Sequence, residues 1–286
     1  MGKMNREREI SVETITAKVR ELFITANREL SGDVREALAK AAEEEVSPLG
    51  RYVLGKILEN VEVACNEDLP LCQDTGLAVV FVEMGQDVHI VGGDFNAAVQ
   101  EGVRQAYREG YLRKSVCDPL SRQNTGDNTP AVIISEIAAG DRLKLIAMPK
   151  GGGSENMSSS AMLTPAVGEA GIRAHVVDCI RRAGSNPCPP VIVGVGIGGS
   201  LEMSAILAKK ALLRPLGTAN DRDDRLATME RELLAEINRL GIGPQGYGGR
   251  VTALAVQVEM MPCHIASLPV TVNIQCHVAR HREAVI

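Results

Sequence analysis

Aromatic side chains are scarce in this chain: they make up 2% of its 286 residues, and tryptophan is absent. Proteins that bind single-stranded nucleic acid stack the bases on aromatic side chains, so the composition argues against that class. The formal net charge of −5 argues against a polyanionic partner for the same protein. We therefore expect no nucleic-acid partner.

Long apolar runs are also missing. No stretch approaches the ~20 residues that span a bilayer, and the N-terminus carries Lys3, Arg6 and Arg8 where a signal peptide would have an apolar core. We expect a cytoplasmic protein with no membrane partner. Hydrophobic residues make up 45% of the chain, which is ample for a packed core. Because no repeat or linker interrupts it, we predict a single domain over residues 1–286.

The seven cysteines are an odd number, they are scattered, and they lack CxxC spacing, which argues against a disulfide scaffold. Cys65 and Cys179 fall within helical patterns, so we predict that both are small buried hydrophobes. Three others differ because each stands beside Pro, Gln-Asp or His at the edge of a predicted element. These three candidates for chemistry are Cys72, Cys188 and Cys276.

Apolar periodicity predicts an α/β fold, with a mixed β-sheet flanked by helices and a helical N-terminal region over residues 12–64. The strongly charged helix predicted over 220–240 is expected to present a solvated face. The strands over 131–137 and 143–148 are expected to pair with each other. The cysteines are expected on loops at one rim of the sheet. The remaining predicted strands cover 77–84, 191–197, 251–260 and 265–275, and the helices cover 96–109, 165–182, 201–213 and 220–240.

The stretch around Cys188 is unusual because Pro187, Pro189 and Pro190 surround the cysteine. Proline fixes φ and removes a backbone donor, so the thiol is expected on a stiff, non-helical loop. The apolar run and glycines over 191–199 then predict a strand that turns tightly into a helix, a corner suited to an anion. The same glycines satisfy GxGxxG, which leaves a nucleotide-binding protein as an alternative.

A glycine run, Gly151–Gly153, follows Lys150 directly after a predicted strand. Three glycines allow close backbone approach to a ligand, and a nest of N–H groups beside a lysine would bind carboxylate or phosphate. A flexible surface loop is the other interpretation of this run. It is not a P-loop, because the GxxxxGK[ST] spacing is absent.

Three presented cysteines leave two metal interpretations open. Structural zinc sites usually show paired short spacings, which are missing here. An iron–sulfur cluster held by three thiolates keeps one iron open as a Lewis acid. An open iron beside Asp74 and the anion corners fits chemistry on a hydroxy acid.

Several motifs together resemble the class I, iron–sulfur-dependent fumarate hydratases, in the order of that family and over nearly the whole chain. The motifs are Leu71–Gly76 (LCQDTG), Lys150–Asn156 (KGGGSEN), Cys188–Pro190 (CPP) with Gly194–Gly199, and Cys263–Val270 (CHIASLPV) with Cys276-His277.

The resemblance implies that Cys72, Cys188 and Cys276 ligate a [4Fe-4S] cluster with one open iron. That iron would polarise the hydroxyl of malate in the reversible hydration of fumarate to (S)-malate, with a small dicarboxylate as substrate.

The same resemblance implies the residues around the substrate. Gln73 and Asp74 would lie beside it, and Gly152 would offer backbone N–H groups to one carboxylate. Arg113 would bind a carboxylate, and His264 would contact the reacting acid. Asp74 and His264 are the expected catalytic residues.

Single-chain members of the family continue into a second domain that carries the proposed base, and this sequence stops at Ile286. The chain therefore resembles the α subunit of a two-subunit enzyme, active only with a β subunit, and a dimer of that unit is expected. The nearest alternative is the α subunit of L-tartrate dehydratase. The Lys150–Asn156 and His264–Pro269 stretches look more like the fumarases. A non-catalytic protein with structural cysteines is a further alternative.

Overall fold

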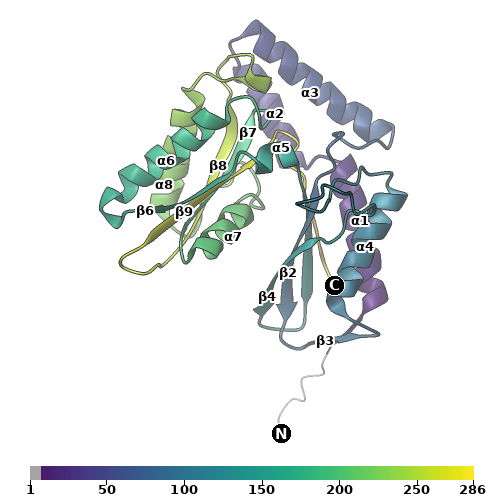
Figure 1. Ribbon diagram of the computed structural model, residues 1–286. Helices are drawn as coiled ribbons and strands as arrows, with labels where there is room; N and C mark the ends of the chain where they lie inside the picture. Colours follow the sequence, from purple (N-terminus) through teal and green to yellow (C-terminus); the bar gives the residue numbers. More distant parts are fainter. Residues whose placement is uncertain (1–7) are drawn as a thin grey trace. The chain divides into compact units, whose positions relative to one another are not determined.

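The computed structural model describes residues 8–286 of the chain (Figure 1). The chain forms two compact units. The first unit comprises residues 8–30, 63–151 and 280–286 of the described chain, and the second comprises residues 31–62 and 152–279. The single domain predicted for residues 1–286 thus contains two units, each with a hydrophobic core of its own.

The first unit is built on a mixed four-stranded sheet with the strand order β10-β5-β2-β4. Strand β2 pairs parallel with β4 and antiparallel with β5. The remaining two strands of the first unit, β1 and β3, pair with each other in a parallel two-stranded sheet. Their bounds are β1 Arg8–Ser11, β2 Leu77–Gly85, β3 Val88–Val91, β4 Val132–Ala138, β5 Leu143–Lys150 and β10 Arg282–Val285.

The predicted pairing of residues 131–137 with 143–148 is wrong, because β2 lies between these two strands. The connection from β4 to β5 passes over the end of β2, where Gly85 N–H donates to Arg142 O at 2.8 Å. A Cβ atom on Gly85 would lie 2.3 Å from Gly140 O, so only glycine permits this close crossing.

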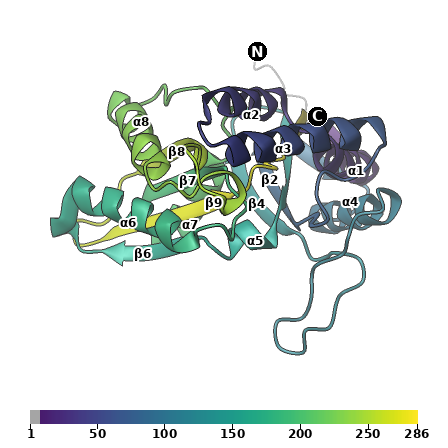
Figure 2. The same cartoon turned by 90° about the horizontal axis from the view of Figure 1, so that it is seen from above.

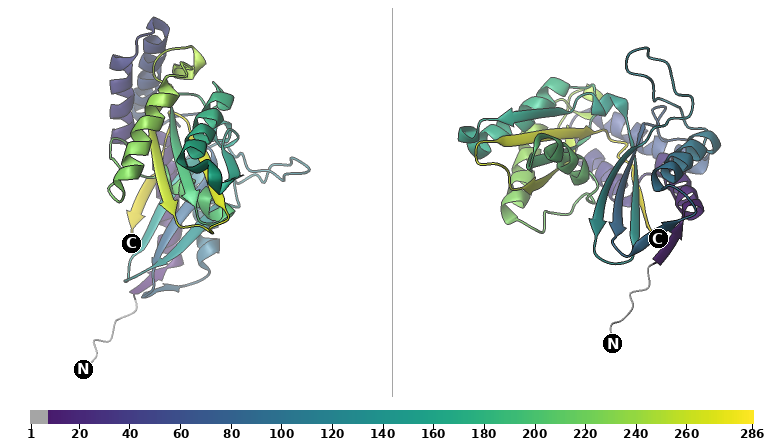
Figure 3. Two further views of the ribbon diagram at one scale, coloured as in Figure 1. Left: turned by 90° about the vertical axis from the view of Figure 1, so that its left-hand side faces the viewer. Right: turned by 60° about the horizontal axis from the view of Figure 1, so that its bottom comes forward.

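Two helices, α1 (Val12–Arg28) and α4 (Phe95–Glu109), cover one face of this sheet (Figure 3). Gly102 lets them approach closely, since a Cβ atom there would lie 2.8 Å from Thr16 O. The core between helices and sheet includes Ile15, Val19, Phe23, Val80, Val82, Val99, Val103, Tyr107 and Leu145.

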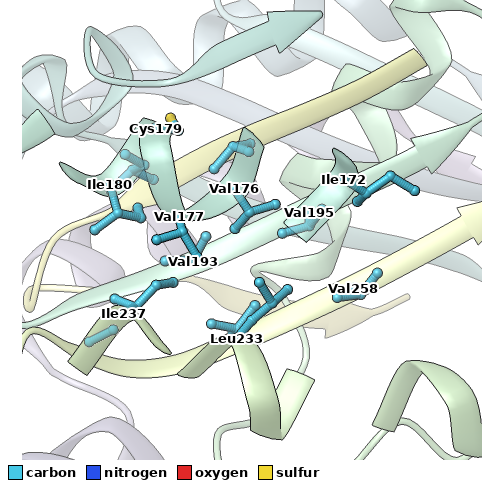
Figure 4. Packing of buried hydrophobic residues seen from close by; sticks show 14 of the residues in the cluster. Ile172, Val176, Val177, Cys179, Ile180, Val193, Val195, Leu233, Ile237 and Val258 are labelled. Carbon is cyan, nitrogen blue, oxygen red and sulfur yellow. The ribbon is translucent and has the colours of Figure 1, made fainter. Parts of the chain in front are cut away.

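The second unit has another mixed four-stranded sheet, with the order β6-β9-β7-β8. Helices α6 (Gly168–Ala183) and α8 (Asp224–Asn238) pack on one face and α7 (Leu201–Ala211) packs on β7 from the other. Figure 4 shows side chains of α6 and α8 meeting those of β7 and β8. The strands are β6 Ser159–Leu163, β7 Val191–Gly198, β8 Ala253–Met261 and β9 Leu268–Gln275, with short helices α5 Gly152–Glu155, η1 Pro165–Val167 and η2 Pro244–Gly246.

The charged helix predicted over 220–240 is more than a solvated face. Its apolar positions recur at helical spacing, so α8 buries Leu226, Leu233 and Ile237 in the core (Figure 4). Glu230 is also buried, and its carboxylate forms an ion pair with Arg214 and accepts Val258 N–H.

The glycines of the GxGxxG stretch serve packing. Gly194 and Gly196 lie within β7, where Cβ atoms would lie 2.1 Å from Ala208 O and 2.0 Å from Ser204 O of α7. The helix backbone therefore rests directly on the strand. The turn comes later, at Gly198 and Gly199, which both have positive φ. Glycines inside a strand do not form the phosphate-binding turn of the nucleotide alternative.

Helices α2 (Gly32–Glu44) and α3 (Pro48–Asn66) confirm, with α1, the three helices predicted over residues 12–64. α3 continues across the boundary between the two units. Over residues 8–286, no helix has both the length and the apolar character that crossing a membrane requires.

Glu45, at the end of α2, is a fully buried carboxylate. It accepts hydrogen bonds from the backbone N–H groups of Val46, Ser47, Arg250 and Val251, at 2.8–2.9 Å. Burial alone would raise the pKa of Glu45, but these four donors favour the anion and hold its pKa below the ordinary value.

We predict that Glu45→Gln lowers the free energy of unfolding at pH 7 by about 2–3 kcal/mol, because the amide nitrogen would face buried donors. Since the pKa is lower in the folded state, the stabilisation is present above the unfolded-state pKa of about 4.3 and disappears as pH falls through the folded value. Urea unfolding across pH 3–7 measures this difference. Glu44→Gln, at an exposed position of the same helix, is the control. A constant difference between wild type and Glu45→Gln across that pH range would contradict the prediction.

Gly196→Ala is expected to destabilise the protein by about 3 kcal/mol, because its Cβ would overlap the backbone of α7. Thermal unfolding measures the effect. Gly55→Ala is the matched control, since no atom lies within 4 Å of a Cβ there. In the middle of α3 that change should stabilise by about 0.5–1 kcal/mol. Equal effects at both glycines would refute the packing argument.

Candidate functional site

The Cys72 loop, residues 72–76, joins the first helical region to β2. Leu71 N–H donates to Asn27 O at the end of α1, which fixes the start of the loop. Asp74 N–H then donates to Cys72 Sγ at 3.4 Å, and Gly76 N–H donates to Asp74 Oδ1 at 3.0 Å. The loop thus holds the sulfur and the carboxylate in a defined local conformation.

Three buried side chains bind the successive carbonyl groups of residues 74–76. The Arg280 guanidinium donates to Asp74 O. The Tyr107 hydroxyl lies 2.7 Å from Thr75 O and 2.9 Å from Gly76 O, and Asn128 Nδ2 donates to Gly76 O at 3.1 Å. Burial raises the pKa of Tyr107, so its hydroxyl remains a donor at all physiological pH values.

Arg113 lies next to this loop. Thr75 Oγ1 donates to Arg113 O at 2.8 Å, and the Arg113 side chain is exposed. Arg113 begins the long loop that leads from α4 to β4 and projects from the first unit (Figure 2). Asn128 ties the two ends of that loop together, since its Oδ1 accepts Ser115 N–H at 2.6 Å. The first unit therefore brings Cys72, Gln73, Asp74 and Arg113 together.

Cys188 and Cys276 lie at the same end of the two inner strands of the second unit's sheet. Cys188 precedes β7, and Cys276 directly follows β9. These strands are antiparallel, with Ile192 opposite Gln275, so the start of one meets the end of the other. Two of the three cysteines expected at one rim thus lie at the same end of these strands, and the convergence of all three stays a prediction.

The backbone of the Cys188 loop is held by two side chains. Cys188 has a φ of +56°, a conformation that few non-glycine residues adopt. His277 Nδ1 lies 2.9 Å from Cys188 O and 3.1 Å from Gln245 Nε2; it donates to the carbonyl in the tautomer protonated on Nδ1 and accepts from the amide in the other. Gln245 binds Pro189 O twice, from its backbone N–H at 2.7 Å and from Nε2 at 2.9 Å.

Gly152 begins the short helix α5, which lies near the end of β9 on the same side as Cys188. A Cβ atom on Gly153 would lie 3.5 Å from Asn186 O in the Cys188 loop. Glu155 Oε2 accepts Asn273 Nδ2 at 3.0 Å, which joins α5 to the end of β9. Glu155 also forms an ion pair with Lys209 at 2.5 Å. The glycine run therefore continues into a short helix that approaches the Cys188 loop and is joined to β9.

His264 lies at the opposite end of the strands of the same sheet. His264 follows β8 in the turn to β9. The eight residues of β7 span the sheet from one end of the strands to the other, so roughly 20 Å separates His264 from the end where Cys188 lies. His264 Nδ1 accepts Ala266 N–H at 3.1 Å. The structure thus does not bring His264 to Cys188 and Cys276. It lines a mainly apolar cavity of about 580 Å³ with Cys263, Ile197, Met229, Met260, Met261 and Leu268.

Every cysteine is a thiol rather than half of a disulfide. Cys179 is buried as predicted, and burial raises its pKa to about 11, which makes it unreactive. The same prediction for Cys65 is wrong, because Cys65 lies on the exposed face of α3. Cys188 is exposed, and Cys72 and Cys276 are partly exposed.

Three cysteine thiols, the donor set that these loops carry, are of the kind that holds an iron–sulfur cluster. Cys72 accepts an N–H···S hydrogen bond, a contact that commonly surrounds cluster sulfurs. Throughout residues 8–286, no three His, Cys, Asp or Glu side chains form a group that could hold a metal ion. Cys72 belongs to the first unit, and Cys188 and Cys276 belong to the second.

The sequence analysis missed the residues that bind the loop carbonyls: Tyr107, Asn128, Gln245 and Arg280. Two of them carried a signal. Tyr107 is one of only four tyrosines in an aromatic-poor chain, and Gln245 lies in the glycine-rich segment GPQGYGG. Asn128 and Arg280 carried none, because a polar side chain in a loop or tail is ordinarily solvated.

Comparison with known proteins gives a consistent family. The family described as Fumarate hydratase (Fumerase) matches residues 16–285. A protein provisionally named L(+)-tartrate dehydratase subunit alpha, from Methanocaldococcus jannaschii, is 44% identical over 268 residues, which cover 92% of this chain and 94% of that protein. The L(+)-tartrate dehydratase subunit alpha of Escherichia coli K12 is 30% identical over 280 residues, covering 96% and 91%. These names are those of hydro-lyases. The chain belongs to the fumarate hydratase (Fumerase) family.

Proposed function

We propose that this chain is the α subunit of a two-subunit hydro-lyase that hydrates fumarate to (S)-malate. The observation that carries the proposal is the family match over residues 16–285, which includes all three cysteine motifs. Cys72, Cys188 and Cys276 would hold a [4Fe-4S] cluster. When bound, such a cluster supplies a Lewis-acid iron for the hydroxyl of the substrate.

The polar groups near Cys72 suit a dicarboxylate. The exposed Arg113 guanidinium would pair with one carboxylate in a bidentate manner. Gln73 would donate an amide N–H to the bound acid, and the Asp74 carboxylate, oriented by Gly76 N–H, would transfer or hold a proton. Backbone N–H groups at Gly152 would bind the second carboxylate. A role for His264 stays a prediction from the sequence.

The proposed β subunit would supply the base that removes the carbon-bound proton. The relatives in Methanocaldococcus jannaschii and Escherichia coli carry the name subunit alpha, which supports a second subunit here. We propose that this chain alone has little or no activity and that a dimer of the α/β unit is the working enzyme.

L-tartrate is the second candidate substrate, because the relatives at 44% and 30% identity are named tartrate dehydratase subunits. Tartrate carries one hydroxyl group more than malate, the product of fumarate hydration. A site built for fumarate and malate would reject the extra hydroxyl of tartrate by about 100-fold. A site that hydrogen-bonds that hydroxyl would reject malate and fumarate by about 10⁴-fold or more.

We predict that Cys72→Ser, Cys188→Ser and Cys276→Ser each weaken cluster binding by at least about tenfold. The measurement is iron and sulfide content, with visible absorption, after anaerobic reconstitution of the full chain. Cys65→Ser, at an exposed cysteine outside the motifs, and Cys263→Ser, at an exposed cysteine that is not a proposed ligand, are controls that should load as wild type does. Normal loading of all three motif variants would eliminate the proposed ligands.

We further expect kcat/KM for fumarate and (S)-malate to exceed that for L-tartrate by about 100-fold in the reconstituted α/β enzyme. Steady-state assays with all three acids, with and without the co-expressed β subunit, measure this ratio. A ratio that favours L-tartrate would assign the chain to the second candidate. Full activity of the chain alone would contradict the need for a partner.

A further inference from the structure

Arg280 is a buried cation that forms no ion pair with any of residues 8–286. Its side chain is 3% exposed, and one guanidinium N–H donates to Asp74 O. Among the residues that the structure describes, its Nε and Nη1 atoms are buried without a hydrogen-bond partner. Arginine stays charged in proteins, so the charge cannot be relieved by loss of a proton.

Burial of such a group works against stability. Moving a charged group out of water costs several kcal/mol unless opposite charge and hydrogen bonds offset it. The neighbouring carbonyls of the same loop are bound by Tyr107 and Asn128, which are neutral and carry no such penalty. A neutral donor would bind Asp74 O at lower cost. Stability therefore gives no reason for an arginine at position 280.

We propose that Arg280 is a positioning residue for the Cys72 loop. By binding Asp74 O it fixes the peptide that follows the Asp74 side chain, and Asp74 N–H in turn donates to Cys72 Sγ. Its positive charge also favours the approach of negative groups to this loop. The inference rests on the proposed function only for the identity of what Cys72 binds.

The test separates loop order from fold stability. Arg280→Met removes the charge and the donor but keeps most of the volume, and Arg280→Lys restores a charged donor. Arg282→Met is the matched control, since Arg282 pairs with Glu29 rather than with the loop. Three measurements apply to the full chain: thermal unfolding, hydrogen exchange of the amides of residues 73–76, and iron content after anaerobic reconstitution.

For Arg280→Met we expect an unchanged or higher unfolding temperature, at least tenfold faster exchange over residues 73–76, and iron content at least halved. Arg280→Lys should recover part of both losses, and Arg282→Met should match wild type. Failure of Arg280→Met to fold, or a lowered unfolding temperature with unchanged loop exchange, would show a structural role and overturn the proposal. If wild type takes up no cluster, the proposed function fails, but the exchange ratio still decides the role of Arg280.

Discussion

The need to satisfy backbone carbonyls outside regular structure governs both cysteine loops. A loop has no strand ladder, so its buried polar groups must find partners elsewhere. Side chains supply them here: Arg280, Tyr107 and Asn128 for residues 74–76, and Gln245 for Pro189, with His277 Nδ1 2.9 Å from Cys188 O. The conformation of each loop is therefore set by donors that are far away in the sequence.

Two buried charges in this chain contrast in how they are satisfied. Glu45 receives hydrogen bonds from four backbone N–H groups, and Gly50 and Gly249 leave room around it, so its burial stabilises the second unit. Within the described part of the chain, Arg280 donates to Asp74 O and keeps two buried nitrogen atoms without partners. A satisfied buried charge is typical of structure, whereas an unsatisfied one is typical of a site under functional constraint.

Local patterns predicted the elements well and their arrangement poorly. Helical spacing located α1, α2 and α3, and the prolines correctly placed Cys188 on a loop before β7. The insertion of β2 between β4 and β5 was not predictable, because strand order depends on contacts between distant segments. Likewise, Arg280 and Asp74 are 206 residues apart, and no periodicity reports such a pair. Of the candidate site, the cysteines were predicted from the sequence and stay predicted ligands, whereas the side chains that hold their loops were not predicted.

The antiparallel register of β9 against β7 connects the core to the chemistry. Val270, Val272 and Ile274 face the core of the second unit, while the intervening Thr271, Asn273 and Gln275 point to the other face. A slip of one residue would place those polar side chains, which are buried on the other face, within the hydrophobic core, and would shift Cys276 by roughly 3.3 Å along the strand. The alternation of apolar and polar residues in β9 therefore fixes the register of the strand. Apolar side chains that touch no substrate thereby determine where the Cys276 thiol lies.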